Sequence, residues 1–320
     1  MQTDIAKFPK IIVITGPTAV GKSAVALELS SQFGAEIVSA DSRQIYRYLD
    51  IGTAKPTAAE RAIVPHHLVD VVDPDEPYSA ACFKADAEKV LQDLALRERV
   101  AFLVGGSPHY VQSVVDRLEI PKVPPQPEFR REMDEYARVH GHQKLHQMLR
   151  DVDPESAERI AATNVRRVIR ALEVQKVTGE PFSKVGRRRG EPLPALRIAI
   201  TTERKLLYRR IDERLDQQIR DGLLEETKRV LEMGYDASLQ PLSGLVYREA
   251  VAIIRGKMGL DEGIERMKMA THAFARRQYA WFRRDPNLIW FEAGPHLVDQ
   301  VREAISNYLE ADITDRCIDR

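Results

Sequence analysis

Residues 16–23, "GPTAVGKS", have the types and spacing of a loop that binds a diphosphate group. Glycines let several backbone N–H groups turn toward one anion, and a helix that starts here adds unpaired donors and its positive dipole end. The Lys22 ammonium supplies a full charge, and the Ser23 hydroxyl can ligate Mg²⁺. We therefore expect a phosphate loop with a magnesium cofactor, formed by Gly16, Pro17, Thr18, Ala19, Val20, Gly21, Lys22 and Ser23.

Asp41 is a second candidate because it directly follows a predicted strand at residues 36–40. In open α/β sheets, ligands bind beyond the carboxyl ends of the strands. Ser42, Arg43 and Gln44 add donors and acceptors at the same place. An aspartate here can also serve only as a cap, and both roles stay open at this point. The apolar strand predicted at residues 100–104 ends in "GGSPHY" and lacks the acid that an NTPase would carry there.

Two adjacent histidines, His66 and His67, lie near Asp70 and Asp73 and raise the possibility of a metal site. Adjacent histidine side chains project in different directions, and no third His or Cys follows at ligand spacing. The pattern favours a structural loop.

The elements that must position these residues alternate between strand and helix. Short apolar, β-branched runs predict strands at 10–15, 36–40, 100–104, 197–201 and 288–291. The fold class is therefore α/β, a P-loop NTPase-like parallel sheet flanked by helices. Helices are expected at 22–33, 212–233 and 260–281, and a C-terminal helix is expected to pack through Leu297, Val301, Ile305 and Leu309.

Two proline- or arginine-rich stretches, 121–127 ("PKVPPQP") and 186–194 ("GRRRGEPLP"), frame a segment with a helical pattern. We interpret them as linkers. The predicted domains are a first part of the core at 1–118, a helical insertion at 119–195 and a second part of the core at 196–320.

The bulk composition excludes several classes of protein. The 320 residues include 48 basic and 48 acidic side chains, so the net charge identifies no partner. The only cysteines, Cys82 and Cys317, form no C-x-x-C pair, which argues against a disulfide framework or a zinc site. The sequence contains neither a signal-peptide pattern nor an apolar run of about 20 residues. We expect a cytoplasmic, monomeric protein that does not associate with membranes.

Basic residues are concentrated in parts of the chain. Residues 159–214 contain fifteen Lys and Arg against six Asp and Glu. Three arginines of residues 187–189 are expected on an exposed loop, and arginines at 276, 277, 283 and 284 alternate with aromatic residues. Each run alone is more typical of a solvated face. Together they suit phosphate contacts and base stacking in RNA.

The order of the motifs is more specific than any one of them. "GPTAVGKS", "SADSRQIY", "DIGTAKP", "HHLVDVVDP", "YSAACFKADA" and "VGGSPHY" follow one another, and "NVRRVIRALEVQKVTGEPFS", "LYRRIDERLDQQIRDGLLEE" and "FARRQYAWFRRD" come later. In this arrangement the chain resembles the tRNA dimethylallyltransferase (tRNA isopentenyltransferase) family over about residues 10–292.

The resemblance implies a reaction and a set of roles. The family transfers a dimethylallyl group from dimethylallyl diphosphate to N6 of the adenosine beside the tRNA anticodon, adenosine 37, and releases diphosphate. The phosphate loop then holds the prenyl diphosphate, and a helical arginine assists the leaving group. We favour Arg210 for that arginine, with Arg214 one turn later as a further diphosphate contact. Asp41 is the implied general base, and the Ser107 hydroxyl stands where the family has a threonine.

The resemblance and the basic clusters together predict contacts with tRNA, whose target base must leave its stack. The predicted tRNA contacts are Asp41, Ser42, Arg43, Gln44, Ser107, Arg130, Arg166, Arg167, Val168, Ile169, Arg170, Arg276 and Arg277.

The chain departs from the family pattern at two places. Pro108 and His109 replace a glycine and an apolar residue, and we expect His109 at the surface. Val246 in "GLVYRE" stands where the family has glycine before the tyrosine. A valine at positive φ would be strained, so we expect this loop to differ and do not count Tyr247 as a site residue.

Three other functions compete with tRNA prenylation. An adenylate isopentenyltransferase would share the phosphate loop but modify free nucleotides. A P-loop small-molecule kinase would hold ATP in the loop. A non-catalytic RNA-binding protein would not need the set of Lys22, Ser23 and Asp41.

Overall fold

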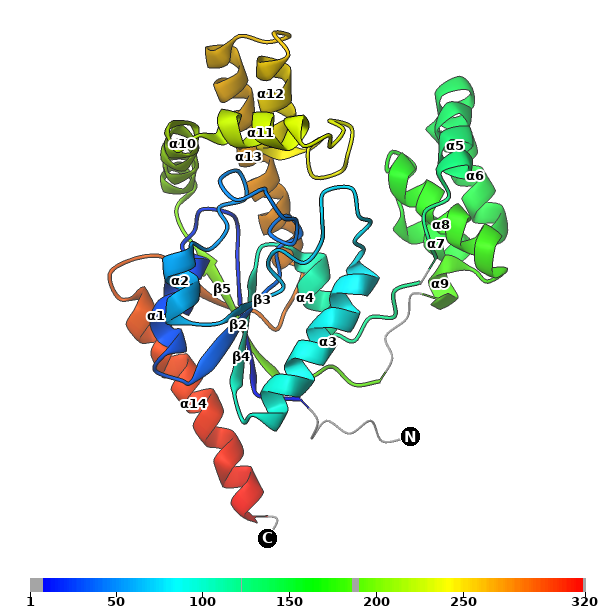
Figure 1. The fold of residues 1–320 in the computed structure, drawn as a ribbon. Coiled ribbons are helices and arrows are strands. Elements are labelled where there is room, and N and C mark those ends of the chain that lie inside the picture. The colour runs from blue at the N-terminus through cyan, green and yellow to red at the C-terminus, as the bar shows by residue number, and fades with distance from the viewer. Residues whose placement is uncertain (1–7, 122, 186–189, 319–320) are drawn as a thin grey trace. The chain divides into compact units, whose positions relative to one another are not determined.

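A parallel six-stranded sheet forms the centre of the first compact unit, in the order β3-β2-β4-β1-β5-β6 (Figure 1). The computed structural model describes residues 8–121, 123–185 and 190–318, with side chains through residue 311. The strands are β1 Ile11–Thr15, β2 Ala35–Ser39, β3 His66–His67, β4 Val100–Gly105, β5 Ala195–Thr201 and β6 Ile289–Glu292. The five predicted strands are confirmed, and the short β3 was missed.

Helices cover both faces of the sheet because its central strands are apolar on both sides. In β1, Ile12 and Ile14 join a core with α1 (Lys22–Ser30) and α14 (Leu297–Ile318). Ile11 and Val13 join the opposite core with α3 (Ala80–Leu96) and α4 (Pro108–Val115). This alternation follows from the period of two in a strand. The predicted C-terminal helix is confirmed.

A third core lies beyond the carboxyl edge of the sheet, under four helices at the top of Figure 1. These helices are α10 Arg204–Arg220, α11 Leu223–Glu232, α12 Leu245–Ile254 and α13 Leu260–Phe282. The prediction of a single helix over 212–233 was wrong. The chain turns at Gly222, whose φ of 100° is accessible mainly to glycine, and this separates α10 from α11.

Four helices were not predicted: α2 (Ala58–Ile63), α3, α4 and α12. Local signals for the first two are present. Thr57 and Glu60 form a reciprocal capping box at the start of α2, and the Ser79 hydroxyl accepts from the Cys82 N–H at the start of α3.

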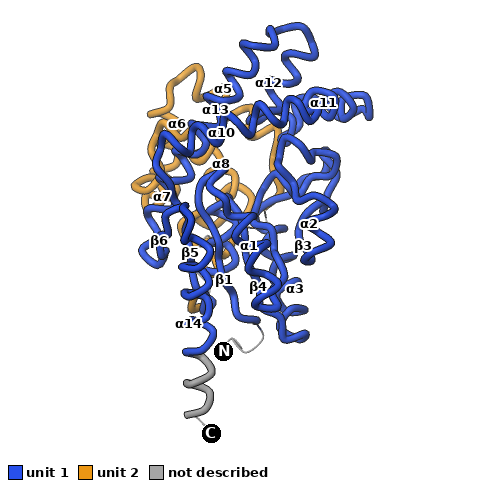
Figure 2. The backbone as a smooth tube through the Cα atoms, turned by 90° about the vertical axis from the view of Figure 1, so that its left-hand side faces the viewer, with its two compact units in different colours: residues 1–115, 193–320 blue, residues 116–192 orange. Residues whose placement is uncertain are grey.

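Residues 116–192 form the second compact unit, coloured orange in Figure 2. Its helices are α5 Pro127–His140, α6 His142–Val152, α7 Pro154–Arg159, α8 Val165–Thr178 and α9 Phe182–Val185. They enclose a separate apolar core that includes Leu145, Leu149 and Val168. The predicted insertion, 119–195, begins and ends three residues later than this unit.

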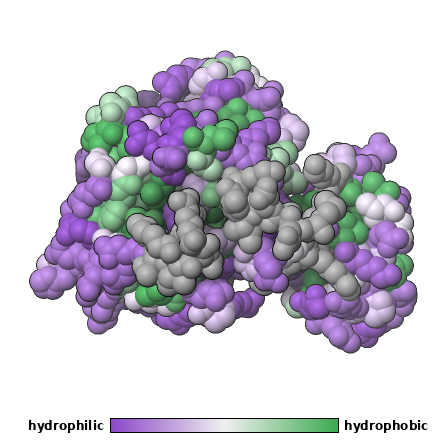
Figure 3. Space-filling model, turned by 90° about the horizontal axis from the view of Figure 1, so that it is seen from below, coloured by the Kyte–Doolittle hydropathy of each residue, from purple (hydrophilic) through white to green (hydrophobic). Residues whose placement is uncertain are grey.

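On the face shown in Figure 3, hydrophilic residues predominate and hydrophobic ones gather in small groups. Among the described helices, none combines the length and apolar character that crossing a membrane requires.

Candidate active site

Three loops meet at the carboxyl edge of the sheet because β2, β4 and β1 are neighbours. Thr15 at the end of β1 lies beside Gly105, and Ser39 at the end of β2 lies beside Val104 of β4. The phosphate loop, the segment that starts at Asp41 and the loop that carries Ser107 follow these strands directly. The sheet edge is thus the place where a phosphate site and an acid are brought together.

The phosphate loop is surrounded by cationic groups. The Lys22 ammonium donates to the Pro17 carbonyl (2.7 Å), and an Arg214 N–H donates to the Thr18 hydroxyl (2.8 Å). Burial lowers the pKa of Lys22 to about 8; the charge of Asp41 opposes this shift and that of Arg214 adds to it. Burial also lowers the pKa of Arg214. Two partly desolvated cations at one loop favour an anionic ligand.

The structure distinguishes the two candidate arginines of α10, Arg210 and Arg214. Arg214 is bonded to the phosphate loop, whereas Arg210 has no hydrogen bond or ion pair with any described residue. The geometry therefore favours Arg214 over Arg210 as the arginine beside the leaving group.

Asp41 is half-buried, and its Oδ1 accepts a hydrogen bond from the Arg43 N–H (2.9 Å). This bond closes a local Asx turn; residues 42–45 form a turn and no described helix begins here, so the helix-cap role considered as an alternative was wrong. Within the described part of the chain, Oδ2 has no hydrogen-bond partner, so the carboxylate keeps an oxygen that can accept a proton.

Ser107 joins the loop after β4 to the Asp41 segment. Its hydroxyl accepts from the Ser42 N–H (3.0 Å) and donates to the Ser42 hydroxyl (3.2 Å). Predicted residues 41, 42 and 107 are thus brought together. His109 is exposed, as expected.

In this conformation the side chains of Arg43 and Gln44 form hydrogen bonds that hold neighbouring segments together. Arg43 donates to the Pro241 carbonyl (3.1 Å). The Gln44 amide accepts from the Ser39 hydroxyl (3.0 Å) and donates to the Ala54 carbonyl (3.0 Å). Their predicted contacts with tRNA stay predictions, because the Gln44 amide and one guanidinium nitrogen of Arg43 are bonded within the protein here.

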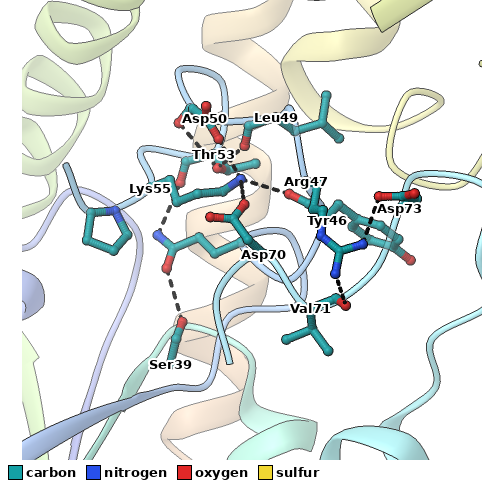
Figure 4. Close-up of polar contacts among 12 residues, drawn as sticks. Ser39, Tyr46, Arg47, Leu49, Asp50, Thr53, Lys55, Asp70, Val71 and Asp73 are labelled. Atoms are coloured by element: carbon teal, nitrogen blue, oxygen red, sulfur yellow. Dashed lines mark hydrogen bonds and ion pairs between the residues drawn. The ribbon is translucent and has the colours of Figure 1, made fainter. Parts of the chain in front are cut away.

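A buried lysine organises the loop that follows, as Figure 4 shows. Lys55 donates to the Tyr46 carbonyl (2.8 Å) and to the carboxylates of Asp50 and Asp70 (2.6 Å each). Burial would raise the pKa of Asp70, but the hydrogen bonds and charges of Lys55 and Arg61 outweigh it and lower that pKa. In the sequence this lysine is visible only as part of the motif "DIGTAKP", which by itself indicates no role for it.

Glu226 of α11 anchors the same loop from the helical layer. Its carboxylate accepts the N–H groups of Asp50 (2.7 Å), Ile51 (2.8 Å) and Gly52 (3.2 Å), and the Tyr247 hydroxyl (2.7 Å). Tyr247 is therefore an anchoring residue. The expected strain at Val246 was wrong: Val246 lies in α12, and the positive φ falls on Leu245 (44°).

The paired histidines are held by structural partners. His67 contacts Glu36 (2.7 Å), and His66 contacts the Val64 carbonyl (2.8 Å). Hydrogen bonds from Arg97, reinforced by His67, lower the pKa of Glu36 to about 2 despite its burial. The described residues contain no group of three or more metal-ligating side chains.

Of the RNA contacts predicted in the second unit, some side chains are exposed and others are buried. Arg166 and Arg167 are exposed, and neither guanidinium has a partner among the described residues. Val168 and Ile169 are buried in the core of the unit, which contradicts RNA contacts through their side chains. Residues 187–189 lie outside the described residues.

Arg130 and Arg170 differ from those two exposed arginines. Both pair with the fully buried Glu173, at 2.7 and 2.6 Å, and Arg170 also donates to the Val123 carbonyl. Burial alone would raise the pKa of Glu173, but its hydrogen bonds with Arg130, the Gln126 N–H and Arg170 lower it to about 2. Because a buried carboxylate needs these partners, Arg130 and Arg170 have a structural role, and their predicted contacts with tRNA stay predictions.

The outer side of α13 carries cations and aromatic rings together. Arg276 is exposed and donates to the Tyr208 hydroxyl (2.9 Å), and the Tyr208 ring stacks on His272 at 4.0 Å. Arg277 is exposed and lies over the Phe274 ring. This surface keeps the character predicted for an RNA contact.

Gln278 of α13 is a site residue that the sequence analysis missed. Its Oε1 accepts from the Thr18 N–H (2.8 Å), and its Nε2 donates to the Gly106 carbonyl (2.7 Å). A signal was present in the sequence: Gln278 is the one amide on the buried stripe Met267, Thr271, Ala275, Gln278 and Phe282. A polar side chain on a buried helix face requires partners.

The phosphate loop also carries a hydroxyl group that could ligate a magnesium ion. Ser23 is exposed at the start of α1, and no described residue hydrogen-bonds its hydroxyl. Hydroxyl and phosphate oxygens are the hard ligands that Mg²⁺ prefers.

Comparisons with known proteins all indicate the same family. A family model described as IPP transferase matches residues 44–285, and one described as isopentenyl transferase matches residues 9–64. The chain is 46% identical over 302 residues to a tRNA dimethylallyltransferase of Roseiflexus sp. (strain RS-1), covering 94% of this chain and 99% of the relative. A tRNA dimethylallyltransferase of Thermomicrobium roseum is 43% identical, with coverages of 95% and 92%.

Solved structures show the same likeness. The full-length tRNA isopentenylpyrophosphate transferase from Bacillus halodurans aligns with a TM-score of 0.71 at 35% identity, covering 96% of this chain and 99% of that one. A eukaryotic dimethylallyltransferase acting on tRNA aligns with a TM-score of 0.78 at 26% identity, with coverages of 95% and 80%.

Proposed function

The chain belongs to the tRNA dimethylallyltransferase family, and from this premise we propose that it transfers a dimethylallyl group from dimethylallyl diphosphate to N6 of adenosine 37 in tRNA. The assignment of roles rests on one observation: a cationic phosphate loop and an acidic side chain lie together at one edge of the sheet. The charges of Lys22, Arg214 and Asp41 act on one another there.

The phosphate loop is the part of the site that binds the leaving group. When the bond from the allylic carbon to oxygen breaks, negative charge grows on the diphosphate. Lys22, Arg214 and the N–H groups at the start of α1 stabilise this charge. Magnesium held at Ser23 would supply further neutralisation of the same oxygens.

The Asp41 segment is the part of the site that acts on the attacking amine of the substrate. The adenine N6 amine is a weak nucleophile because its lone pair is delocalised into the ring. Asp41 accepts the N6 proton as the new carbon–nitrogen bond forms. Ser107 orients this segment through its two hydrogen bonds with Ser42.

The target base reaches the site by leaving its stack. Exposed arginines with no structural partner, Arg166 and Arg167, support phosphate contacts from the second unit. Arg276 and Arg277 offer further cations beside aromatic rings on α13. We also propose that the enzyme acts as a cytoplasmic monomer, since one chain supplies both the phosphate loop and the acid.

The test is a transfer assay with purified protein, dimethylallyl diphosphate, Mg²⁺ and either unmodified tRNA or free adenosine monophosphate. We expect prenylation of the tRNA at adenosine 37, located by nuclease digestion and mass spectrometry. A tRNA with guanosine at position 37 is the matched control and should stay unmodified. Transfer to the free nucleotide but not to tRNA would assign the chain to the adenylate type instead.

A further inference from the structure

We infer that Gln278 is a positioning residue for prenyl transfer, because one buried amide holds the loop of the leaving group and the loop of the acceptor at a fixed separation. This inference rests on the proposed function. Gln278 is 5% exposed and lies near the C-terminal end of α13, about one turn before Phe282. It lies 260 residues from Thr18 and 172 from Gly106 in the chain.

The two hydrogen bonds fix the orientation of the amide. Oε1 faces an N–H group of the phosphate loop, and Nε2 faces the Gly106 carbonyl. Rotating the amide by half a turn would set donor against donor and acceptor against acceptor. Each bond is therefore satisfied only while both loops keep their present places.

Each loop bonded by Gln278 also carries reacting groups. On one side, Thr18 receives the Arg214 hydrogen bond, so the amide and the guanidinium hold the same residue. On the other side, Gly106 precedes Ser107, which is bonded to Ser42 beside Asp41. A continuous chain of contacts thus joins the leaving-group cations to the proposed base.

The double glycine is explained by the same contacts. A Cβ at Gly106 would collide with the Gln278 amide nitrogen, and one at Gly105 would collide with the backbone of Ala40. The backbone after β4 must therefore lack side chains to approach both the amide and the end of β2. Since reacting atoms need an alignment within fractions of an ångström, loss of the amide should affect the chemical step above all.

The first experiment compares Gln278→Met, which keeps the length of the side chain but makes neither bond, with the wild-type enzyme. We expect the single-turnover rate at saturating tRNA and dimethylallyl diphosphate to fall about 10- to 100-fold. The Kd for each substrate should stay within roughly threefold. Gln218→Met is the matched control: Gln218 is also a buried glutamine on a helix, and it donates to the Ile51 carbonyl. Its melting temperature should fall without a comparable loss of single-turnover rate.

A second variant, Gln278→Glu, supplies a readout that depends on the bond itself. The carboxylate can still accept from Thr18 but cannot donate to Gly106 until it is protonated. The ratio of its single-turnover rate to that of wild type should therefore rise as the pH is lowered, whereas the ratio for Gln278→Met should stay flat.

The outcomes are distinct. If the wild-type enzyme prenylates tRNA and Gln278→Met has the same single-turnover rate, the positioning role is overturned but the proposed function is not. Equal losses of melting temperature, binding and rate in the Gln278 and Gln218 variants would do the same, because they indicate a general packing role. A wild-type enzyme that does not prenylate tRNA would overturn the proposed function and this inference with it.

Discussion

Arg214 donates a 2.8 Å hydrogen bond to the Thr18 hydroxyl across 196 residues of chain, while Arg210, one helical turn earlier, has no described partner. We therefore expect Arg214→Met to reduce kcat/KM about 10- to 100-fold, the effect of losing a hydrogen bond from a charged group at the reacting centre. Arg210→Met is the paired control and should lose less than about threefold. Steady-state kinetics with both substrates measure the difference, and a larger loss at Arg210 would reverse the assignment.

Lys22 predicts a pH dependence of substrate binding. Its pKa of about 8 lies below the ordinary value of 10.5, so the ammonium of the free enzyme deprotonates as the pH rises through about 8. An anionic diphosphate binds the charged form better, and the Kd for dimethylallyl diphosphate should therefore rise from about pH 7 to about pH 9. Isothermal titration calorimetry would measure this rise.

Lys22→Arg is the control for that experiment, since an arginine stays charged throughout this range. Its absolute affinity can differ, but its Kd should change little with pH. An equally steep pH dependence in the arginine variant would assign the titration to another group.

Asp41 can be tested without breaking its turn. Asp41→Asn keeps an oxygen that accepts from the Arg43 N–H but removes the proton acceptor. We expect the single-turnover rate to fall about 10²- to 10⁴-fold, with tRNA affinity retained. Rapid-quench assays and filter binding on the same preparation provide the two readouts. Near-normal turnover would remove Asp41 from the base role.

The arginines of the second unit predict a contrast in salt dependence. Replacing Arg166 and Arg167 together by glutamine should weaken tRNA binding and reduce the slope of log Kd against log salt by about one per lost phosphate contact. Arg170→Gln instead removes a partner of the buried Glu173 and should lower thermal stability with little change in slope. If the slope of log Kd against log salt is the same in the double variant and in Arg170→Gln, Arg166 and Arg167 are solvated residues that do not contact tRNA phosphates.

The Glu226 anchor predicts a change in stability. Its carboxylate accepts three backbone N–H groups and the Tyr247 hydroxyl, and it is 4% exposed. Glu226→Gln would turn an N–H₂ group toward donors, which should cost roughly 2 to 4 kcal/mol in the free energy of unfolding. Urea denaturation followed by circular dichroism would measure it. Tyr247→Phe removes one donor only and should cost less.

Local patterns in the sequence determined much of this protein. A β-branched run followed by glycines, Lys22 and Ser23 specifies a strand, a phosphate loop and a helix, because each requirement is met by neighbouring residues. The uninterrupted apolar run of Ile11–Thr15 likewise specifies a strand buried on both faces. The ordered motifs were sufficient to indicate the family and its reaction.

The tertiary structure decided what depends on residues far apart in the chain. The choice of Arg214 over Arg210 depends on how α10 packs on the phosphate loop, and the spacing of arginines cannot reveal it. The buried state of Val168 and Ile169, and the pairing of Arg130 and Arg170 with Glu173, separate structural cations from exposed ones. Gln278 shows the same limit most clearly: its place on an apolar helix stripe indicates that its amide needs partners, but only folding across 260 residues places it between the two loops that the reaction must align.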